Sequence, residues 1–469
     1  MGTPNQYSRR LFLQRAILAS VAAAGGGSVL AGCASGGGDT SSESGGESSA
    51  ENPFGVKADA ALDVVIFKGG YGDDYAKFHE ELYTKKFSGA QVKHAGITDV
   101  RQQLQPRFNS GNPPDVIDNS GAEQLPLATL ADTGQLADLT RLFDAESIDG
   151  GKIRETLNPV AVEAGDYGGK ILVLNYALEV YGLWYDKTLF DKKGWQPAES
   201  WADFLALCQE IKGAGIAPMA HQGKYPYYIQ QVTMDMAVKH GGKEVVTAID
   251  SLEPNAWKHP SVKMAAEALL EIKSKGYMLQ GTEGLDHIQS QTRWNEGKAA
   301  FIPSGSWLEN EQKKVAPKDF ATTVAPTPLM DGAKLPFQST RVSAAEAFIV
   351  PAKAKNLPGG LEYLRIMLSK EGASKFTELT AAPTVVNGAG EDLELTPAAA
   401  SASELVKAGG DNNWNYYYFV WYSPMRPKIE TAFGELAAGR VTADEFCAAC
   451  QKAADETAKD PQTKKRTRS

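Results

Sequence analysis

The run from Leu174 to Lys187 is the feature that most constrains the fold of this chain. It is a dense apolar and aromatic stretch with one carboxylate, Glu179, in its middle. Its β-branched and aromatic content predicts a buried strand. A lone Glu in such a strand costs free energy unless it is paired or faces a polar space. Two interpretations stand: Glu179 ends in solvent, or it faces a polar ligand where two halves of the protein meet.

The length and the charge limit the remaining possibilities. A chain of 469 residues is too long for one compact core, so two lobes are expected. The formal net charge of −9 argues against a nucleic acid as the main partner. The six histidines are scattered without metal-binding spacing, so no metal and no cofactor is expected.

The N-terminus predicts export and a lipid anchor. Ser8 to Leu13 contains a twin-arginine motif, and the apolar segment that follows is too short to span a membrane. Leu30-Ala31-Gly32-Cys33 resembles the lipobox of bacterial lipoproteins, in which the chain is cut before the cysteine and the thiol is lipidated. We therefore expect a signal peptide at 1–32, lipidation at Cys33 and a flexible linker over 33–56. The Gly- and Ser-rich part of that linker has an r.m.s. reach of roughly 25 Å.

The other cysteines do not form a disulfide framework. Cys208 falls on the apolar face of a helix that begins after Ser200. Cys447 and Cys450 lie in a helix that starts at a capping box, Thr442 to Glu445. We expect two packed thiols there, with a single disulfide formed after export as the alternative.

Strands and helices alternate at the start of the folded body. Leu62–Phe67 predicts a buried strand, and a helix follows with Tyr75, Phe78 and Leu82 on its apolar face. The alternation continues to a strand with a polar end at 115–120, which indicates an α/β lobe with a mostly parallel sheet. Ligands of such sheets lie beyond the carboxyl ends of the strands, so Tyr71 and Asn119 are expected on one rim.

Three later segments are aromatic. Tyr225 and Tyr227 lie in a loop before a helix, and Trp307 follows a short strand. The run 412–422 is the richest in aromatic residues and precedes Arg426. The basic tail, 461–469, is expected to be solvated.

Several segments together resemble the extracellular solute-binding proteins of carbohydrate ABC transporters, which include the maltose-binding proteins. The matching segments span about 62–454 and are 182–190, Trp201, 215–218, 297–301, 305–307 and 438–442. The resemblance implies a two-lobe α/β fold with a ligand cleft between hinged lobes. It places the N-terminal lobe at 57–176 plus 343–382, and the C-terminal lobe at 177–342 plus 383–460.

The resemblance also implies a set of ligand-binding residues. Glu179 falls on a ligand-binding carboxylate, Tyr225 and Tyr227 on a binding loop, and Trp307 on a stacking tryptophan. Arg426 falls near a stacking position that is aromatic in the family, so a flat guanidinium contact or no contact is expected there. A sugar ring has an apolar face that suits aromatic side chains and a hydroxyl edge that suits polar ones. On that basis Tyr71, Asn119, Trp414 and Trp421 complete the candidate set.

A closer similarity to actinobacterial lipoproteins that bind N-acetylglucosamine and its dimer, chitobiose, implies the same ligands here. The expected function is capture of this sugar at the outer face of the cell membrane and delivery to an ABC permease, without catalysis. Three alternatives stay open. The ligand is a maltose- or cellobiose-type oligosaccharide, or the chain is a surface lipoprotein without a transporter. The third is a secreted glycoside hydrolase that uses Glu179 and Glu309.

Overall fold

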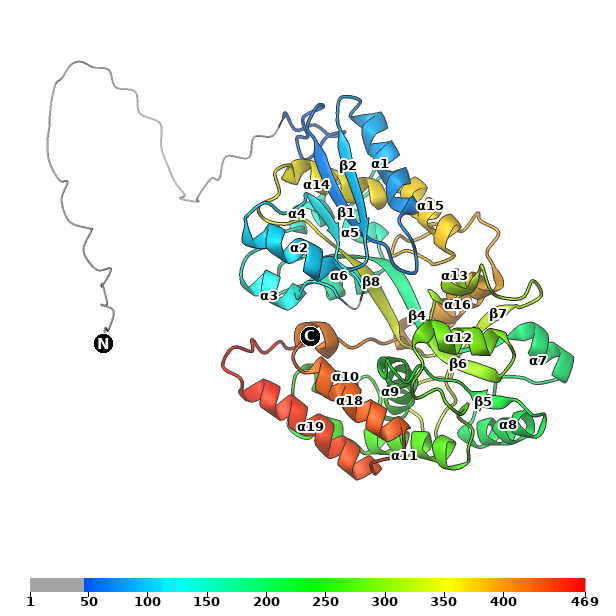
Figure 1. Ribbon diagram of the computed structural model, residues 1–469. Coiled ribbons are helices and arrows are strands. Elements are labelled where there is room, and N and C mark those ends of the chain that lie inside the picture. Colours follow the sequence, from blue (N-terminus) through cyan, green and yellow to red (C-terminus); the bar gives the residue numbers. More distant parts are fainter. Residues whose placement is uncertain (1–45, 122, 469) are drawn as a thin grey trace, which may run out of the picture. The chain divides into compact units, whose positions relative to one another are not determined.

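The computed structural model describes residues 46–121 and 123–468. The expected signal peptide, Cys33 and the first part of the expected linker lie outside these described residues. The folded body contains one continuous path of paired strands with helices around it (Figure 1). The strands in spatial order are β2 (Val92–Ile97), β1 (Leu62–Phe67), β3 (Val116–Asp118), β8 (Val342–Ile349), β4 (Leu174–Asp186), β6 (Ala299–Gly305) and β5 (Ala217–Met219), with β7 (Thr322–Ala325) also on β4.

The strand β4 runs through both halves of this path. Its first half, 174–180, pairs antiparallel with β8, and β8 continues the pairing to β3. Its second half, 181–186, pairs antiparallel with β6 and β7. On the far side β1 is parallel to β2 and β3. The expected strand over 174–187 is therefore present, and it carries the chain from one lobe into the other.

Helices pack around each half of the strand path. Those of the N-terminal lobe are α1 (Asp74–Lys86), α2 (Val100–Asn109), α3 (Leu127–Asp132), α4 (Thr140–Asp144), α5 (Ile153–Thr156), α6 (Pro159–Gly165), α14 (Leu357–Met367) and α15 (Lys370–Thr380). Those of the C-terminal lobe are α7 (Lys187–Lys193), α8 (Trp201–Gly213), α9 (Tyr227–Gly241), α10 (Glu244–Asp250), α11 (Pro260–Ser274), α12 (His287–Asn295), α13 (Leu308–Gln312), α16 (Pro397–Gly409), α17 (Tyr418–Trp421), α18 (Arg426–Ala437) and α19 (Ala443–Lys459).

Each half has its own hydrophobic core. One large cluster of buried side chains draws on residues between Phe54 and Leu178 and between Val342 and Val386. The other draws on residues between Leu183 and Ala454. The change from one core to the other falls inside β4, close to Glu179. A carboxylate at that point lies between two apolar cores and is not buried within either.

Local sequence signals place several helices correctly. The Ser200 hydroxyl accepts from the Asp203 amide at the start of α8, and the capping box from Thr442 to Glu445 starts α19. Cys208 is fully buried, and Cys447 and Cys450 are free, buried thiols, so the packed-thiol interpretation is confirmed.

Two expectations from the sequence hold only in part. On α1, Tyr75 is buried and Leu82 packs partly against the core as expected, but His79 and Tyr83 are buried in place of Phe78. In the tail, residues 461, 462, 464, 465 and 467 are exposed as expected, but the Arg466 side chain is 8% exposed and is held by Asp132. Acidic and aromatic side chains from distant helices surround this tail, and its own sequence gives no sign of them.

Candidate functional site

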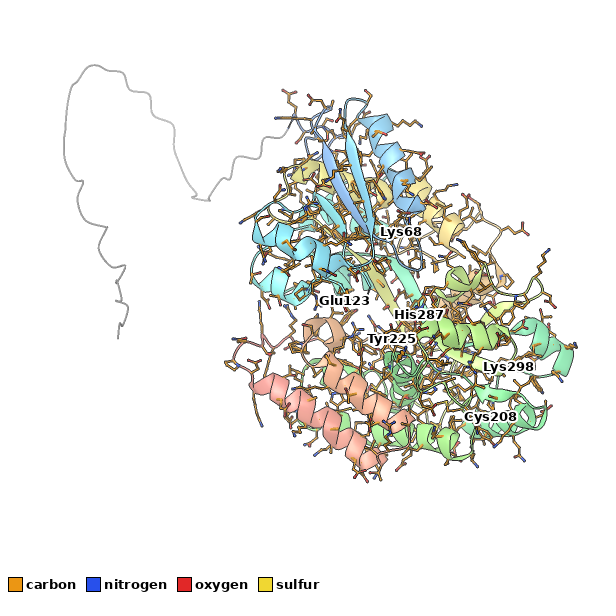
Figure 2. All side chains as sticks on the ribbon, in the orientation of Figure 1. Lys68, Glu123, Cys208, Tyr225, His287 and Lys298 are labelled. Atoms are coloured by element: carbon orange, nitrogen blue, oxygen red, sulfur yellow. The ribbon has the colours of Figure 1, made fainter. Side chains whose placement is uncertain are left out.

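A cleft of about 1320 Å³ lies between the two cores and is lined from both. The N-terminal lobe contributes residues 67–74, 120, 121, 123 and 124, and the C-terminal lobe contributes Tyr225, Trp307, 415–417 and 419–421. Figure 2 labels Lys68 and Glu123 on the upper side of this cleft and Tyr225 and His287 on the lower side. The labelled Cys208 and Lys298 are not part of its lining.

Glu179 lies in the wall of the cleft at the change between the cores. Its Oε2 accepts a hydrogen bond of 2.6 Å from the Tyr181 hydroxyl, which also lies 3.2 Å from the Ser343 hydroxyl. Burial raises the pKa of Glu179, and the hydrogen bond from Tyr181 and the positive charge of Arg341 offset part of that rise. The carboxylate is half-buried, so it keeps capacity to accept further hydrogen bonds from a ligand.

Arg341 supplies the positive charge beside Glu179. Its guanidinium lies between two rings, 4.1 Å from the centroid of Tyr181 and 4.0 Å from that of Tyr416. Its Nε donates to Asn415 Oδ1 at 2.9 Å, and its Nη1 donates to Gln231 Oε1 at 2.6 Å. Stacking and paired donors fix a guanidinium in one plane. Arg341 therefore joins the start of β8 to the segment 415–416 and fixes this wall of the cleft.

A second acidic group lies on the side of the N-terminal lobe. Glu346 lines the cleft, and its backbone is left-handed with a φ of 53°, which is rare for a residue other than glycine. Burial raises the pKa of Glu346 well above its usual range, and the nearby charge of Asp118 raises it further. Burial also raises the pKa of Asp118 to about 6, although Ser120 and Tyr75 donate to it. Glu346 and Asp118 are also hydrogen-bonded to each other, so these two buried carboxyl groups form one acidic pair at the side of the N-terminal lobe.

Aromatic side chains form the wall on the C-terminal side. The Trp307 ring meets Tyr181 edge-on at 5.6 Å and lies 6.2 Å from Tyr228. Gly305 permits this placement, because a Cβ at that position would collide with the indole. Tyr227 and Tyr228 begin α9 with ring centroids 4.1 Å apart, and Tyr225 is 40% exposed. These rings offer flat apolar faces to the cleft.

A second aromatic group lies at the other end of the cleft. Trp421 stacks on Tyr417 with centroids 5.2 Å apart and an interplanar angle of 26°. The Arg426 guanidinium lies 4.3 Å from the ring centroid of Phe419, and its Nε donates to Glu430 at 2.9 Å. All of these except Glu430 line the cleft. The aromatic groups at the two ends leave the polar centre around Glu179 and Arg341 between them.

The structure brings seven of the nine sequence-predicted ligand residues to the cleft. They are Tyr71, Glu179, Tyr225, Tyr227, Trp307, Trp421 and Arg426.

Asn119 and Trp414 do not line the cleft. Both polar ends of the Asn119 amide bind the backbone of Leu125. Trp414 is 3% exposed in the core of the C-terminal lobe and donates through Nε1 to Asp235. In both cases the polar atoms are used to hold the fold.

The carboxylate pair required by the hydrolase alternative is not assembled. Glu309 accepts from the Thr396 hydroxyl at 2.6 Å and is not among the described residues that line the cleft. Glu309 therefore cannot act with Glu179 as the acid and nucleophile pair that cleavage of a glycosidic bond requires.

Sequence reasoning missed Arg341, Tyr181 and Glu346. Arg341 follows a segment of small polar residues, and no local pattern distinguishes it from a surface arginine. A signal was present for Tyr181: it lies two residues after Glu179 on a strand, which puts both side chains on the same face. The hydrogen bond from the Tyr181 hydroxyl to Glu179 is consistent with this spacing.

Within residues 46–121 and 123–468, none of the helices combines the length and the apolar character that a membrane span needs. In the same part of the chain, no three His, Cys, Asp or Glu side chains gather as a metal site would require.

Comparison with known proteins gives the family. Residues 69–374 match the family model described as bacterial extracellular solute-binding protein. The match covers well over half of the chain. This chain is a bacterial extracellular solute-binding protein.

Relatives of this solute-binding protein agree with that assignment. The "Diacetylchitobiose binding protein NgcE" of Streptomyces coelicolor is 36% identical over 417 residues, which cover 88% of each chain. Among solved structures, apo RafE from Streptococcus pneumoniae superposes with a TM-score of 0.69 at 17% identity, covering 86% of this chain and 99% of RafE. A "Chitin oligosaccharide binding protein" gives 0.68 at 18% identity, covering 84% and 98%. The two-lobe α/β fold and the resemblance to solute-binding proteins are confirmed.

Proposed function

We propose that this protein is the sugar-binding subunit of an ABC importer, and that its ligand is N-acetylglucosamine, N,N'-diacetylchitobiose or both. The observation that carries the proposal is the composition of the cleft. Aromatic faces at both ends flank a polar centre in which Glu179 is compensated by Arg341. We propose Tyr71, Glu179, Tyr225, Tyr227, Trp307, Trp421 and Arg426 as ligand contacts, with Tyr181, Arg341 and Glu346 added from the structure.

The charges of this cleft favour a ligand without net charge. Glu179 has Arg341 beside it, and Arg426 is paired with Glu430 at 2.9 Å. An ionic ligand would have to compete with the electrostatic effect of Arg341 on Glu179 and with the ion pair between Arg426 and Glu430. A neutral sugar instead places its hydroxyl edge against the carboxyl and amide groups and its C–H face against the rings.

The size of the cleft and the names of the relatives support the choice of sugar. A volume of about 1320 Å³ is larger than a typical small-molecule pocket, so more than one sugar ring fits. A relative at 36% identity is named for diacetylchitobiose, and a structural neighbour is titled for chitin oligosaccharide. Glu346 lines the cleft and offers a carboxyl group for hydrogen bonding with the amide of an N-acetyl group.

The delivery step follows from the same proposal. Lipidation at Cys33 tethers the body to the outer face of the cell membrane, and the linker at 33–56 lets it reach the permease. The lobes close on the sugar by bending where β4 and β8 pass between them. We propose that the N-terminal lobe comprises 57–176 plus 343–382 and the C-terminal lobe 177–342 plus 383–460.

Calorimetric titration of the soluble body, with Cys33 and the preceding residues removed, tests the ligand. We expect saturable one-to-one binding of N-acetylglucosamine or chitobiose, weaker binding of maltose and cellobiose, and recovery of intact sugar. Recovery of cleaved sugar would support the hydrolase instead. Preference for maltose or cellobiose would overturn the choice of sugar and leave the sugar-binding role standing.

Two variants test the site and the anchor. Trp307→Ala should weaken binding about 30-fold, because a central aromatic contact is worth roughly 2 kcal/mol. Trp201→Ala is the matched control, since Trp201 packs on the core of the C-terminal lobe and does not line the cleft. Equal affinity of the Trp307 variant and the wild type would refute the site. Cys33→Ser should release the protein from membranes if the anchor is correct.

A further inference from the structure

The C-terminal residues follow α19, the red helix of Figure 1, and contact Asp132 of α3, Glu163 of α6 and Tyr422 next to α17. Arg466 contacts both lobes at this point. Its Nη2 donates to Asp132 Oδ1 at the end of α3 at 3.0 Å, and its guanidinium lies 4.9 Å from the Tyr167 ring centroid. On the other side, its backbone amide donates to the Tyr422 hydroxyl at 3.0 Å.

Arg468 repeats this arrangement. Its Nε donates to Glu163 of α6 at 3.2 Å, which is a contact with the N-terminal lobe. Its Nη1 donates to Asp250 at 3.3 Å and to the carbonyl oxygen of Asn415 at 2.5 Å, both in the C-terminal lobe. Its guanidinium also lies 4.9 Å from the ring centroid of Tyr417.

These contacts reach the ligand-lining residues directly. Tyr167, Asn415 and Tyr417 all line the cleft. The partner of Arg468, Asp250, is fully buried and accepts from the backbone amides of Tyr417 and Tyr418 at 2.8 Å each. Asp250 therefore fixes the segment that contains the Tyr417–Trp421 stack, and Arg468 supplies the charge that a buried carboxylate requires.

The geometry points to a function for the tail. We propose that residues 460–468 form a C-terminal strap that holds the two lobes together at one end of the cleft, and that Arg466 and Arg468 are positioning residues for the ligand-lining segment 415–421. Because each arginine bridges both lobes, a change in the angle between the lobes must break contacts on one side of the strap. The strap thus limits the lobe angles that the protein samples and preorganises the aromatic end of the cleft.

This inference goes beyond the proposed function, since it concerns the lobes whichever sugar binds. The strap comprises residues 460–468 of the full chain. The sequence already contains a matched control: Lys465 directly precedes Arg466 in the same tail, is exposed, and makes none of these contacts.

The test measures the distance between the lobes. Spin labels at Glu81→Cys and Lys258→Cys, two exposed positions in different lobes, report that distance in the ligand-free protein with Cys33 replaced by serine. In Arg466→Gln/Arg468→Gln we expect the distance distribution to broaden, and in Lys465→Gln we expect no change. Sugar affinity should fall about tenfold in the double variant because the segment 415–421 is no longer preorganised.

Two outcomes would overturn the strap. One is an unchanged distance distribution in a double variant that still unfolds cooperatively. The other is a broadened distribution with an affinity within twofold of the wild type. If the double variant does not fold, Arg468→Lys takes its place, because lysine keeps the charge near Asp250 but cannot reach Glu163 and Asn415 together. Absence of sugar binding by the wild type would refute the proposed function only, since the distance measurement needs no ligand.

Discussion

Replacing Arg341 with methionine should be among the most damaging single changes near the cleft. The side chain is 8% exposed, so its guanidinium interacts with protein groups and hardly with water. Methionine keeps the length and the apolar stem of the side chain and removes the charge and the donors. The variant therefore measures what the guanidinium contributes.

The expected magnitude follows from the contacts of Arg341. Each of the two ring contacts, at 4.1 and 4.0 Å, is worth about 1–2 kcal/mol at a desolvated site. Asn415 Oδ1 loses its donor, which costs about 1–3 kcal/mol if no water replaces it. Glu179 loses a positive charge that offsets part of the cost of burying its carboxylate. Since such terms overlap, we expect the free energy of unfolding to fall by about 3–5 kcal/mol, as is typical when one member of a buried charge pair is removed.

Urea denaturation followed by tryptophan fluorescence measures this loss. Arg440→Met is the control, because the Arg440 side chain is 65% exposed and pairs only with Glu435 on the surface, so its change should stay within about 0.5 kcal/mol. Combining Arg341→Met with Glu179→Gln should restore part of the loss, since no uncompensated carboxylate then remains. A loss below about 1 kcal/mol for Arg341→Met, or strict additivity in the double variant, would refute this account of the cleft.

Two further predictions concern buried titratable groups. Burial lowers the pKa of His79, and likewise of His221, from its ordinary 6.5 to about 4. Below pH 6.5 the unfolded chain therefore binds protons at these two histidines, whereas the folded chain does not. The free energy of unfolding falls by about 3 kcal/mol per histidine between pH 6.5 and 4. His79→Gln should flatten that decline in pH-dependent urea titrations, and an unchanged slope would contradict it. Burial raises the thiol pKa of Cys447 to about 11 and raises that of Cys450 further. A thiol reagent should therefore detect no reactive thiol in the native body without Cys33, and all three thiols in guanidinium. Detection of a single thiol after denaturation would show that Cys447 and Cys450 form a disulfide.

Local signals in the sequence determined the elements and some of their ends. The aromatic run at 174–187 is one strand, and the cap at Ser200 and the capping box at Thr442 start their helices as expected. These features depend on residues two to four positions apart, which a single sequence contains. The same reasoning put Glu179 in a wall between two lobes, because a lone carboxylate in an apolar strand needs a polar environment.

The aromatic run at 412–422 shows where such reasoning stops. Trp414 and Trp421 were equal candidates, yet Trp414 is buried against Asp235 and Trp421 lines the cleft. The run has no single period, so its sequence does not separate a core face from a ligand face. The separation comes from Asp250 and Arg341, which fix the backbone and side chains of 415–418 from outside the run.

By itself, the sequence of this protein determined its α/β character, its two-lobe size and the odd position of Glu179, and it predicts an export signal. Only the tertiary structure decided which charges meet. Arg341 lies between Tyr181 and Tyr416, and Arg468 lies between Glu163 and Asp250, although these partners are distant in the chain. A strand period or a helix cap is a short-range property of the chain. The pairing of a buried charge depends on which helices the fold brings to it, and desolvation makes that pairing decisive for both stability and binding.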